Sequence, residues 1–581
     1  MNSIARNIAL TAILALTAIG GTAQSLNTEV EIRYNETPQL RDFNKIALTP
    51  AISVPKASTI LPPYSYTDVR VGVPGSITTL EAASYADSIY TSPWRGYATL
   101  GFMPKFNLGA SAGYKFLDND HTRLNAWLQY DGTAYEGRPM ENTTPAYNRD
   151  RYIRRNTATV GAALHQAVGR ESFIDAGVDY SFSRFNTPTA YDLTNQNLHR
   201  VNASMLWTLI HNDITYGLGA AFSRFAPTNS LRYKCLDTPD HAHYLQPTRE
   251  NRYDAYGFFR GHIAGASSAG IDLRLSHLNY NHSADVIHNS MELDHGGETH
   301  HTLLSIAPRY CFDVKSFHLD LGVNIDLTFG AGKVFHIAPD AKATWLPSDL
   351  VKVYISATGG QHQNTLGSLH DITPYALPFQ TFRNSQVVAD AEAGVTVGSW
   401  KGFYAEIAFN YGIANDWLMP YTFSEQLTTT FTALDMRGYR LHGKLGYSYR
   451  DLLAISASYE MAPQKLKRGY YLWADRAKRV IDVNFTITPF SPLDINLGWE
   501  YRGGRATTAA VIIDGGGHPV PSTLLRPLRS VNNLKAGALY RITPQWSAFI
   551  TGENLLNRHH YLIGGVPAQG ITGLIGATYK F

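Results

Sequence analysis

The densest gathering of metal-ligating side chains in this sequence lies between positions 282 and 301. Its members are His282, Asp285, His288, Glu292, Asp294, His295, Glu298, His300 and His301. A second acidic and histidine-bearing segment precedes it, with Asp237, Asp240, His241 and His243. Imidazole and carboxylate groups can bind Zn²⁺ or Cu²⁺, but no spacing here matches a defined site. We therefore interpret both segments as solvated polar loops and expect no metal and no cofactor.

Nucleophilic catalysis would need a nucleophile, a base and an orienting group placed together. The chain has 21 His residues, so chance combinations of Ser, His and Asp are unavoidable. It contains no G-x-S-x-G nucleophile elbow. We expect no enzyme activity and assign no catalytic residue. The net charge of +3 is too small to indicate a nucleic-acid partner.

The elements that carry these residues are indicated by a strict alternation between Phe317 and Phe329. Odd positions are apolar throughout, whereas even positions are polar or Gly, including Asp320, Asn324 and Asp326. Successive side chains of a strand point to opposite faces, so one face is apolar and the other polar. A strand of this length suits a tilted membrane crossing, which needs about 9–11 residues. The polar face fits a wet lumen better than a dry core.

Composition supports a membrane barrel. Aromatic residues make up 12% of the chain and charged residues only 17%, below the roughly 25% of soluble domains. No mature segment offers about 20 consecutive apolar residues, which excludes a helical span. We predict an all-β, transmembrane antiparallel β-barrel within residues 94–581. Its strands, about 22 in number, are expected near 94–103, 106–117, 121–132, 153–167, 171–186, 197–211, 213–226, 251–264, 268–281, 300–312, 315–329, 333–346, 349–360, 385–399, 402–413, 432–447, 451–463, 470–487, 491–502, 527–541, 544–552 and 571–581.

The connections between these strands alternate between short and long. Outer-membrane barrels have short periplasmic turns and long outer loops, and this alternation keeps its phase along the whole chain. Trp94, Trp345, Trp400 and Trp546 lie beside predicted short turns, as expected for a periplasmic aromatic girdle. A soluble β-solenoid is the alternative, and no short repeat period supports it. Both chain ends are therefore expected in the periplasm.

The segments before the barrel have different compositions. Residues 1–23 resemble a secretory signal peptide, with Arg6, an apolar stretch, and small residues at Gly21 and Ala23 before the cleavage point. A short buried helix is the alternative. Residues 24–93 are rich in Pro, and we interpret them as a mostly extended periplasmic segment. A lipid anchor is not expected, because no Cys follows the apolar stretch.

The end of the chain carries a family resemblance. It reads ENLLNRHHY at 553–561, PAQG at 567–570 and GATYKF at 576–581. This resembles the C-terminus of TonB-dependent outer-membrane receptors, which end in a strand with a terminal aromatic residue. The resemblance implies that Gly576, Tyr579 and Phe581 form the signal read by the outer-membrane insertion machinery. It also implies a Gram-negative outer-membrane location. That family has an N-terminal plug domain, and we recognise no plug in residues 24–93.

Two functions follow from this interpretation. The first is transport: a receptor or porin-like channel for a solute, embedded in outer-membrane lipid. The second is structural: a barrel subunit of a larger outer-membrane complex for assembly, secretion or surface-protein display. A large barrel with an open lumen would leak. We therefore expect inward-folded outer loops, with 133–152, 227–250 and 361–384 as candidates, or a partner protein that fills or caps the lumen.

Overall fold

A computed structural model describes most of the predicted barrel. The described residues are 93–103, 107–138, 151–186, 195–229, 231–234, 242–245, 247–281, 300–330, 332–376, 383–423, 428–462, 464–466, 476–508, 512–513, 519–520, 525–562 and 566–581. The segments assigned to the signal peptide and the Pro-rich extension lie outside this range, apart from the last residue of the extension. In the described part of the chain, no helix is long and apolar enough to cross a membrane.

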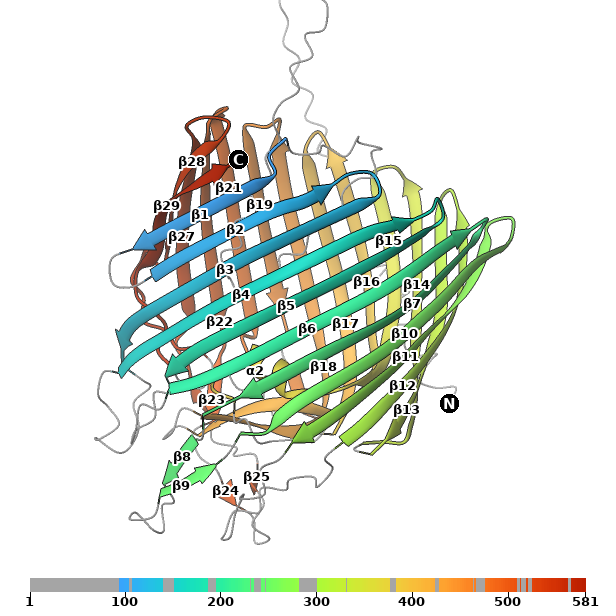
Figure 1. Cartoon of the computed structure of the whole chain (residues 1–581), viewed down its shortest axis with the longest axis horizontal. Helices are drawn as coiled ribbons and strands as arrows, with labels where there is room; N and C mark the ends of the chain where they lie inside the picture. Colours follow the sequence, from blue (N-terminus) through green and yellow to red (C-terminus); the bar gives the residue numbers. More distant parts are fainter. Residues whose placement is uncertain are drawn as a thin grey trace, which may run out of the picture. The chain divides into compact units, whose positions relative to one another are not determined.

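One large antiparallel sheet forms the wall (Figure 1). Its strands are β1 Gly96–Met103, β2 Asn107–Asp118, β3 Thr122–Gly137, β4 Arg151–Val168, β5 Ser172–Asn186, β6 Asn195–His211, β7 Ile214–Pro227, β10 Arg249–Ala264, β11 Ser267–Asn281, β12 His300–Val314, β13 Phe317–Phe329, β14 Phe335–Ser348, β15 Val351–His362, β16 Ser385–Trp400, β17 Phe403–Phe423, β18 Thr428–Tyr449, β19 Leu453–Met461, β20 Gln464–Leu466, β21 Arg479–Phe490, β22 Leu493–Gly503, β27 Val531–Arg541, β28 Trp546–Glu553 and β29 Thr572–Lys580. β19 and β20 pair with consecutive parts of β18 and together occupy the place of one strand. The wall therefore has 22 strand positions.

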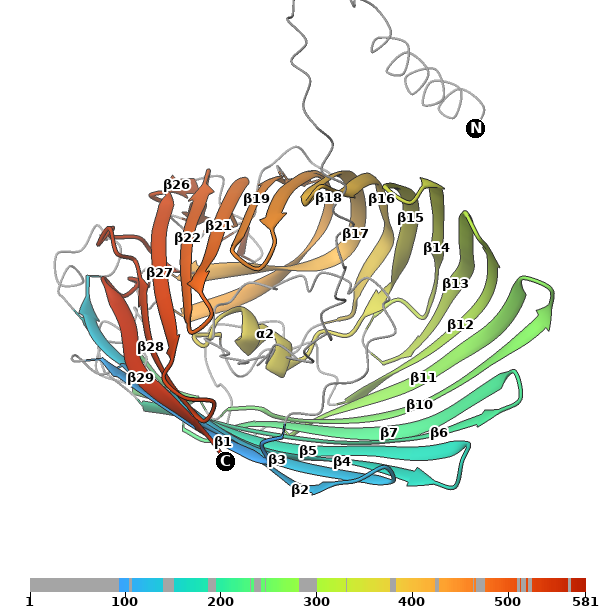
Figure 2. The same cartoon turned by 90° about the horizontal axis from the view of Figure 1, so that it is seen from above.

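The remaining described elements belong to the long connections. They are three short hairpins and one helix: β8 Leu231–Lys234 with β9 Ala242–Leu245, β23 Ala506–Thr508 with β26 Leu525–Pro527, β24 Ile512–Ile513 with β25 Pro519–Val520, and α2 Leu366–Ile372. The hairpins lie at the end of the barrel opposite the C-terminus, which we call the long-loop end (Figure 1), whereas α2 lies inside the ring of strands (Figure 2). The other end carries tight turns and is the short-turn end.

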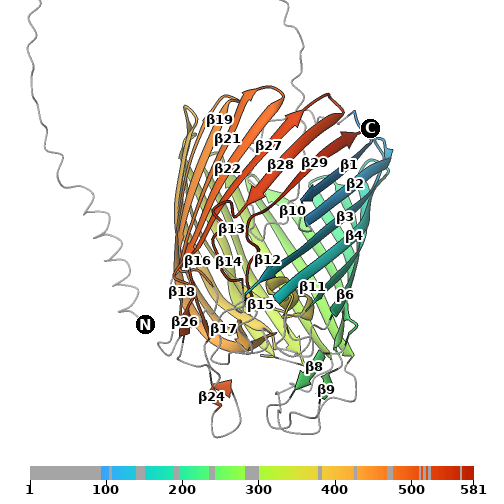
Figure 3. The same cartoon turned by 90° about the vertical axis from the view of Figure 1, so that its left-hand side faces the viewer.

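The sheet closes on itself between its first and last strands. β1 pairs antiparallel with β29, from Tyr97 opposite Lys580 to Phe102 opposite Ile575, and Figure 3 shows these strands side by side. Gly101 and Gly576 face each other in this seam. The ring of Phe549 lies against both glycines, within 3.0 Å of where a Cβ would lie on either. Closure removes the exposed edges that an open sheet would have.

The alternation predicted for β13 is confirmed. Leu321, Val323 and Phe329 expose 46%, 37% and 57% of their surface, whereas Asp326 and Thr328 are almost fully buried. The apolar face is therefore the outer surface of the wall, and the polar face lines the lumen. Exposed apolar side chains recur on other strands, such as Leu218 and Ile575. An outward apolar band of this kind is the lipid-facing surface of a membrane barrel.

The predicted strands agree with the wall strands, with two differences. Residues 414–431 were predicted as a loop, but β17 extends to Phe423 and β18 begins at Thr428. A β-bulge between Ala414 and Trp417 interrupts the apolar alternation without ending the strand, and this hides the strand in the sequence. The strand predicted at 470–487 is also displaced, because β21 begins only at Arg479.

Tight turns at the short-turn end use residues suited to left-handed backbone. Gly169, Asn212 and Gly265 have φ values of 79°, 51° and 60°. Gly and Asn adopt this region at low cost, which is why such turns are recognisable in the sequence. Trp345, Trp400 and Trp546 lie at the ends of strands on this side and expose about half of their surface. This arrangement agrees with the predicted girdle.

Candidate functional site

Of the histidine-rich segment, the structure describes only His300 and His301. Positions 282–299 lie outside the described range, as do Asp237, Asp240 and His241, and nothing is described of the His243 side chain. His301 is buried on the lumen side, and the neighbouring His300 is exposed on the outer side. No group of three His, Cys, Asp or Glu side chains in the described part of the chain is placed to hold a metal ion.

The residues proposed as an insertion signal lie at the closing seam. Gly576 could not carry a side chain without a shift, because an added Cβ would come within 2.2 Å of the Leu100 carbonyl oxygen. Tyr579 and Phe581 lie on the outer face, with ring centroids 5.7 Å apart. Phe581 also stacks on Tyr114 of β2 at 6.0 Å. The three residues thus have structural contacts of their own, and a role as a signal stays a prediction.

The main feature of the lumen is the connection between β15 and β16. Its described residues 363–376 form a segment that we call the strap, and Figure 2 shows its helix α2 inside the ring of strands. Thr365 is the N-cap of the helix, and its side chain accepts a hydrogen bond from the Ser368 amide at 3.0 Å. The Ser368 hydroxyl in turn accepts from the Thr365 amide at 3.1 Å. This reciprocal pair is a capping box, which satisfies amides that a short helix leaves open.

Apolar contacts attach the strap to two opposite parts of the wall. Leu366 is 1% exposed and packs with Phe225, Leu278 and Tyr280, which belong to β7 and β11. Leu369 is 3% exposed and packs with residues of the other part, Leu418 of β17 and Phe431 of β18. A seven-residue helix thus bridges strands that lie on different sides of the lumen (Figure 2).

The end of the strap forms a third contact. Tyr375 packs with Ile153 and Phe185 of the wall, with a ring-centroid distance of 5.8 Å to Phe185. Val566, from the connection between β28 and β29, joins the same cluster and is 1% exposed. The Tyr375 carbonyl accepts from the Thr429 amide at 2.9 Å, which links the strap to β18. The strap is therefore held by side chains from the start, middle and end of the barrel sequence.

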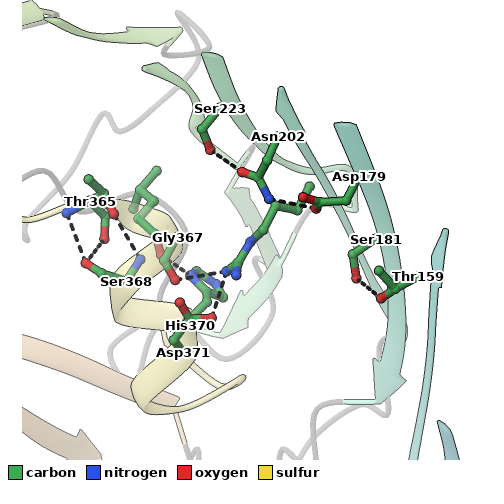
Figure 4. A network of polar contacts seen from close by, with 12 residues as sticks. Thr159, Asp179, Ser181, Asn202, Ser223, Thr365, Gly367, Ser368, His370 and Asp371 are labelled. Carbon is green, nitrogen blue, oxygen red and sulfur yellow. Dashed lines mark hydrogen bonds and ion pairs between the residues drawn. The ribbon is translucent and has the colours of Figure 1, made fainter. Parts of the chain in front are cut away.

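One acidic and one basic side chain of the wall hold the strap backbone. Glu250 of β10 accepts a hydrogen bond from the Leu366 amide, with 2.6 Å between Oε2 and the nitrogen. Arg200 of β6 donates through Nη2 to the Gly367 carbonyl at 3.1 Å and to Asp371 Oδ1 at 2.8 Å. Figure 4 shows Gly367 and Asp371 on the face of the helix that meets these contacts. Hydrogen bonds to charged groups are the stronger class, worth about 1.5–3 kcal/mol when shielded from water.

His370 is the titratable group buried within the strap. Its Nδ1 lies 2.9 Å from the Leu366 carbonyl oxygen, and its ring centroid is 4.7 Å from that of Phe225. The pKa of His370 is lowered to about 4, mainly by desolvation on burial and also by the nearby Arg200 guanidinium, while the bond to the Leu366 carbonyl and the Asp371 carboxylate act in the opposite direction. The imidazole is therefore neutral at physiological pH, with Nδ1–H donating to the carbonyl.

The lumen wall beside the strap is lined by polar groups. Asn202 donates to Asp179 at 2.8 Å and accepts from Ser223 at 2.8 Å (Figure 4). Thr159 donates to Ser181 at 3.1 Å on the adjoining strands. These side chains come from β4, β5, β6 and β7 in turn. The row offers hydrogen-bonding groups to a hydrophilic solute.

Charged groups line the next part of the lumen. Arg309 of β12 lies 3.3 Å from Asp320 and 3.0 Å from Asp340, on the two strands that follow. Asp254 of β10 is paired with Arg252 at 3.0 Å and with Arg274 at 3.2 Å. Positive and negative groups thus alternate across neighbouring strands. Cross-strand pairs of opposite charge stabilise the sheet and leave this wall without a dominant charge.

Comparison with known proteins identifies the fold. No family model matches the chain, and no curated protein matches it by sequence. The structure is similar to a mutant of the ferric enterobactin receptor PfeA from Pseudomonas aeruginosa, with a TM-score of 0.66, 10% identity, and coverage of 84% of this chain and 80% of that one. The siderophore receptor PirA from Acinetobacter baumannii is similar with a TM-score of 0.64 and 10% identity, over 84% of this chain and 80% of that one. FpvA of P. aeruginosa, bound to a heterologous pyoverdine, is similar with a TM-score of 0.59 and 10% identity, over 84% of this chain and 72% of that one.

This chain has the fold of an outer-membrane receptor barrel. The lipid-facing band and the closed wall of 22 positions agree with that assignment. Two of the neighbours named above, PfeA and PirA, are siderophore receptors.

The position of the strap inside the barrel is predictable from the sequence, whereas its contacts are not. The connection 361–384 was one of three loops expected to fold inward, and its residues 363–376 do lie in the lumen. The other two candidate loops, 133–152 and 227–250, are described only in part. Residues 139–150 of the first and 230, 235–241 and 246 of the second lie outside the described range. The cap residues Thr365 and Ser368 were a signal for a helix start that went unused. Arg200 and Glu250 could not be assigned from the sequence, because they lie more than a hundred positions from the strap.

Proposed function

We propose that this protein is a receptor or channel for a hydrophilic solute, and that the strap closes its lumen at the long-loop end. The observation that carries this proposal is the attachment of one short helix to opposite sides of a polar lumen. The hydrogen-bonding groups along the inner wall can bind or pass a hydrophilic solute. The siderophore receptors among the similar structures support the same class of function.

The strap is attached firmly enough to close the lumen and weakly enough to be displaced. Burial of Leu366 and Leu369 stabilises the attachment by about 1.5–3 kcal/mol each. The hydrogen bonds from Arg200 and to Glu250 add to this. A ligand that binds better to the open state by a similar free energy would shift the equilibrium towards opening.

The orientation and the N-terminal segment form a second part of the proposal. The long-loop end faces the outside and both chain ends lie in the periplasm, since outer-membrane barrels place short turns on the periplasmic side. Residues 1–23 act as a signal peptide, and residues 24–93 form a Pro-rich periplasmic extension instead of a complete plug. Transport would then not follow the usual TonB-driven route. The C-terminal residues Gly576, Tyr579 and Phe581 are read by the insertion machinery.

Planar-bilayer recordings test the closure. Wild-type protein is compared with a Leu366→Ser, Leu369→Ser double variant, which loses both apolar attachments, and with Ile372→Ser as the control. Ile372 lies on the same helix but is 44% exposed. The double variant should conduct ions without TonB, while the wild type and the control stay closed or conduct far less. Equal conductance in all three proteins would show that the strap does not close the lumen.

Two further results would redirect the assignment. Solute uptake that disappears when TonB is removed, or a folded plug formed by residues 24–93, would establish an ordinary TonB-dependent receptor. A stable partner protein that copurifies with the barrel, together with no conductance in any variant, would favour the structural subunit of a larger complex. Mass spectrometry of the detergent-extracted protein distinguishes this last outcome.

A further inference from the structure

Five neighbouring strands carry basic side chains on their outer face at the long-loop end. These residues, which we call the outer basic arc, are Arg154 of β4, Arg184 of β5, His199 of β6, Arg224 of β7 and Arg249 of β10. Strands β4 to β7 pair in sequence, and β7 pairs with β10, so the arc is continuous. Neighbouring strands lie about 4.8 Å apart, and the arc therefore spans roughly 20 Å along the wall.

The direction of the arc follows from the strap. Phe185 contacts Tyr375, Phe225 contacts Leu366 and Glu250 bonds to the Leu366 amide, so these three wall residues point into the lumen. Arg184, Arg224 and Arg249 each precede one of them. Because adjacent residues of a strand point to opposite faces, the three arginines point outward. The same argument applies to His199 beside the strap-bonded Arg200, and to Arg154 beside Ile153.

The arc lies at the boundary of the lipid-facing band. Phe182 and Phe222 lie on the same face, two positions nearer the centre of the wall than Arg184 and Arg224. Aromatic contacts run along this level: Phe182 with His199 at 5.0 Å and Phe222 with Tyr253 at 5.2 Å between ring centroids. Below them, the outer face is apolar and includes Val178 and Leu218. Aromatic belts mark the level of the membrane interface.

Within the described residues, the four arginines of the arc have no ion-pair partner, and all four are exposed. No Asp or Glu occupies an outward position at the long-loop ends of these five strands; the polar residues there are Asn156, Asn186, Asn195, Asn197 and Asn251. The corresponding outer positions of β13 and β14 are apolar, with Phe329, Phe335 and Ile337 exposed by half or more. The outer ends of β13 and β14 therefore lack the positive charge that the five strands of the arc carry.

We propose that the outer basic arc binds the phosphate-bearing headgroup of an outer-leaflet lipid. Guanidinium groups match phosphate oxygens with paired hydrogen bonds, and a headgroup with two phosphates could contact several of them at once. The apolar band directly below accommodates the acyl chains of the same molecule. A soluble anion would not need the aromatic and apolar surface that continues from the arc. This binding site goes beyond the proposed transport function and depends only on the orientation of the barrel.

Binding of purified lipid A to the folded protein in detergent tests this site. The probes are lipid A with both phosphates, dephosphorylated lipid A and inorganic phosphate as a competitor. The test variant replaces three arginines, Arg184→Gln, Arg224→Gln and Arg249→Gln. The control variant, Arg437→Gln with Arg479→Gln, removes outward-facing exposed arginines from β18 and β21, outside the arc. Native mass spectrometry counts the bound lipid, and the heat-dependent mobility of each barrel in detergent gels verifies folding.

The triple variant should bind phosphorylated lipid A about tenfold or more weakly than wild type, because three exposed charge contacts of about 0.5–1 kcal/mol each are lost. The control should bind within about twofold of wild type. Arg→Lys at the three positions should recover part of the binding. Equal binding by the triple variant, or equal binding of dephosphorylated lipid A to wild type, would overturn the proposal. So would displacement by inorganic phosphate, since it indicates a simple anion site. If the triple variant does not fold, Arg224→Gln alone is used, with the same comparison.

Discussion

The outer and inner faces of this barrel wall follow different rules. On β13, the outward residues Leu321 and Val323 repeat a simple apolar pattern, whereas the inward Asn324 and Asp326 each have a particular partner. The outer face contacts only the lipid bilayer, and any apolar side chain is compatible with that environment. The inner face meets the strap and other strands. One face is thus specified by composition and the other by individual contacts.

The largest expected effect compares two adjacent residues, one on each face. Val323→Arg places a charge towards the lipid and should destabilise the folded barrel by about 2–4 kcal/mol. Asn324→Arg faces the lumen and loses the hydrogen bond to the Gly359 carbonyl at 2.7 Å, a cost of about 1 kcal/mol. Reversible unfolding in lipid vesicles measures both. Equal losses would mean that the two faces are assigned wrongly.

The attachment of the strap should depend on pH through His370. Its pKa of about 4 in the strap lies below the ordinary 6.5, so the docked state favours the neutral ring. The stabilisation is complete above pH 6.5 and is lost as the pH falls towards 4, by about 3 kcal/mol in total. Hydrogen exchange of strap amides should accelerate over this range. In His370→Gln the acceleration should be much smaller, and an unchanged profile would assign the effect to another group.

Two glycines on the inner face should respond differently to a methyl group. Gly576→Ala would bring a Cβ within 2.2 Å of the Leu100 carbonyl oxygen and should weaken the seam by about 1–3 kcal/mol. Gly177→Ala is the control, since its nearest side-chain atom, in Ser204, would be 3.7 Å away. The temperature at which the barrel loses its compact form on gels measures the difference. A similar temperature for both would show that the seam can relax.

The smallest expected effect concerns the ion pair of the strap. Asp371→Asn removes the charge that faces Arg200, but the Asp371 side chain is 64% exposed. An exposed pair contributes about 0–1 kcal/mol, so the strap should stay attached and its amide exchange should rise less than about fivefold. Glu250→Gln tests the buried contact and should have the larger effect. If Asp371→Asn raised the amide exchange of the strap more than Glu250→Gln, the main electrostatic contact of the strap would be the exposed pair of Asp371 and Arg200.

The features that could be predicted from the sequence belong mainly to the outer face and the turns, and those that could not belong mainly to the inner face. The lipid-facing pattern of Phe317–Phe329 and the turn residues Gly169 and Asn212 act locally, so the strands and their order could be inferred from the sequence. The bulge at Ala414–Trp417 broke that pattern and concealed the extensions of β17 and β18. The contacts of the strap could not be inferred, because they join β6, β10, β11 and β18. The basic arc also required the structure, since no local signal separates an outward Arg from an inward one at the end of a strand.

The seam between β1 and β29 has a consequence for how the chain folds. Thr99 and Thr578 form a hydrogen bond across it, although they are separated by 479 positions in the sequence. Loop-closure entropy rises by only about 0.6 kcal/mol for each doubling of the loop, so this distance costs little in free energy. The separation has a larger effect on the folding rate, because contacts between residues far apart in the sequence form slowly. The ring cannot close until the last strand has been synthesised, and until then both edges of the growing sheet need protection from other chains.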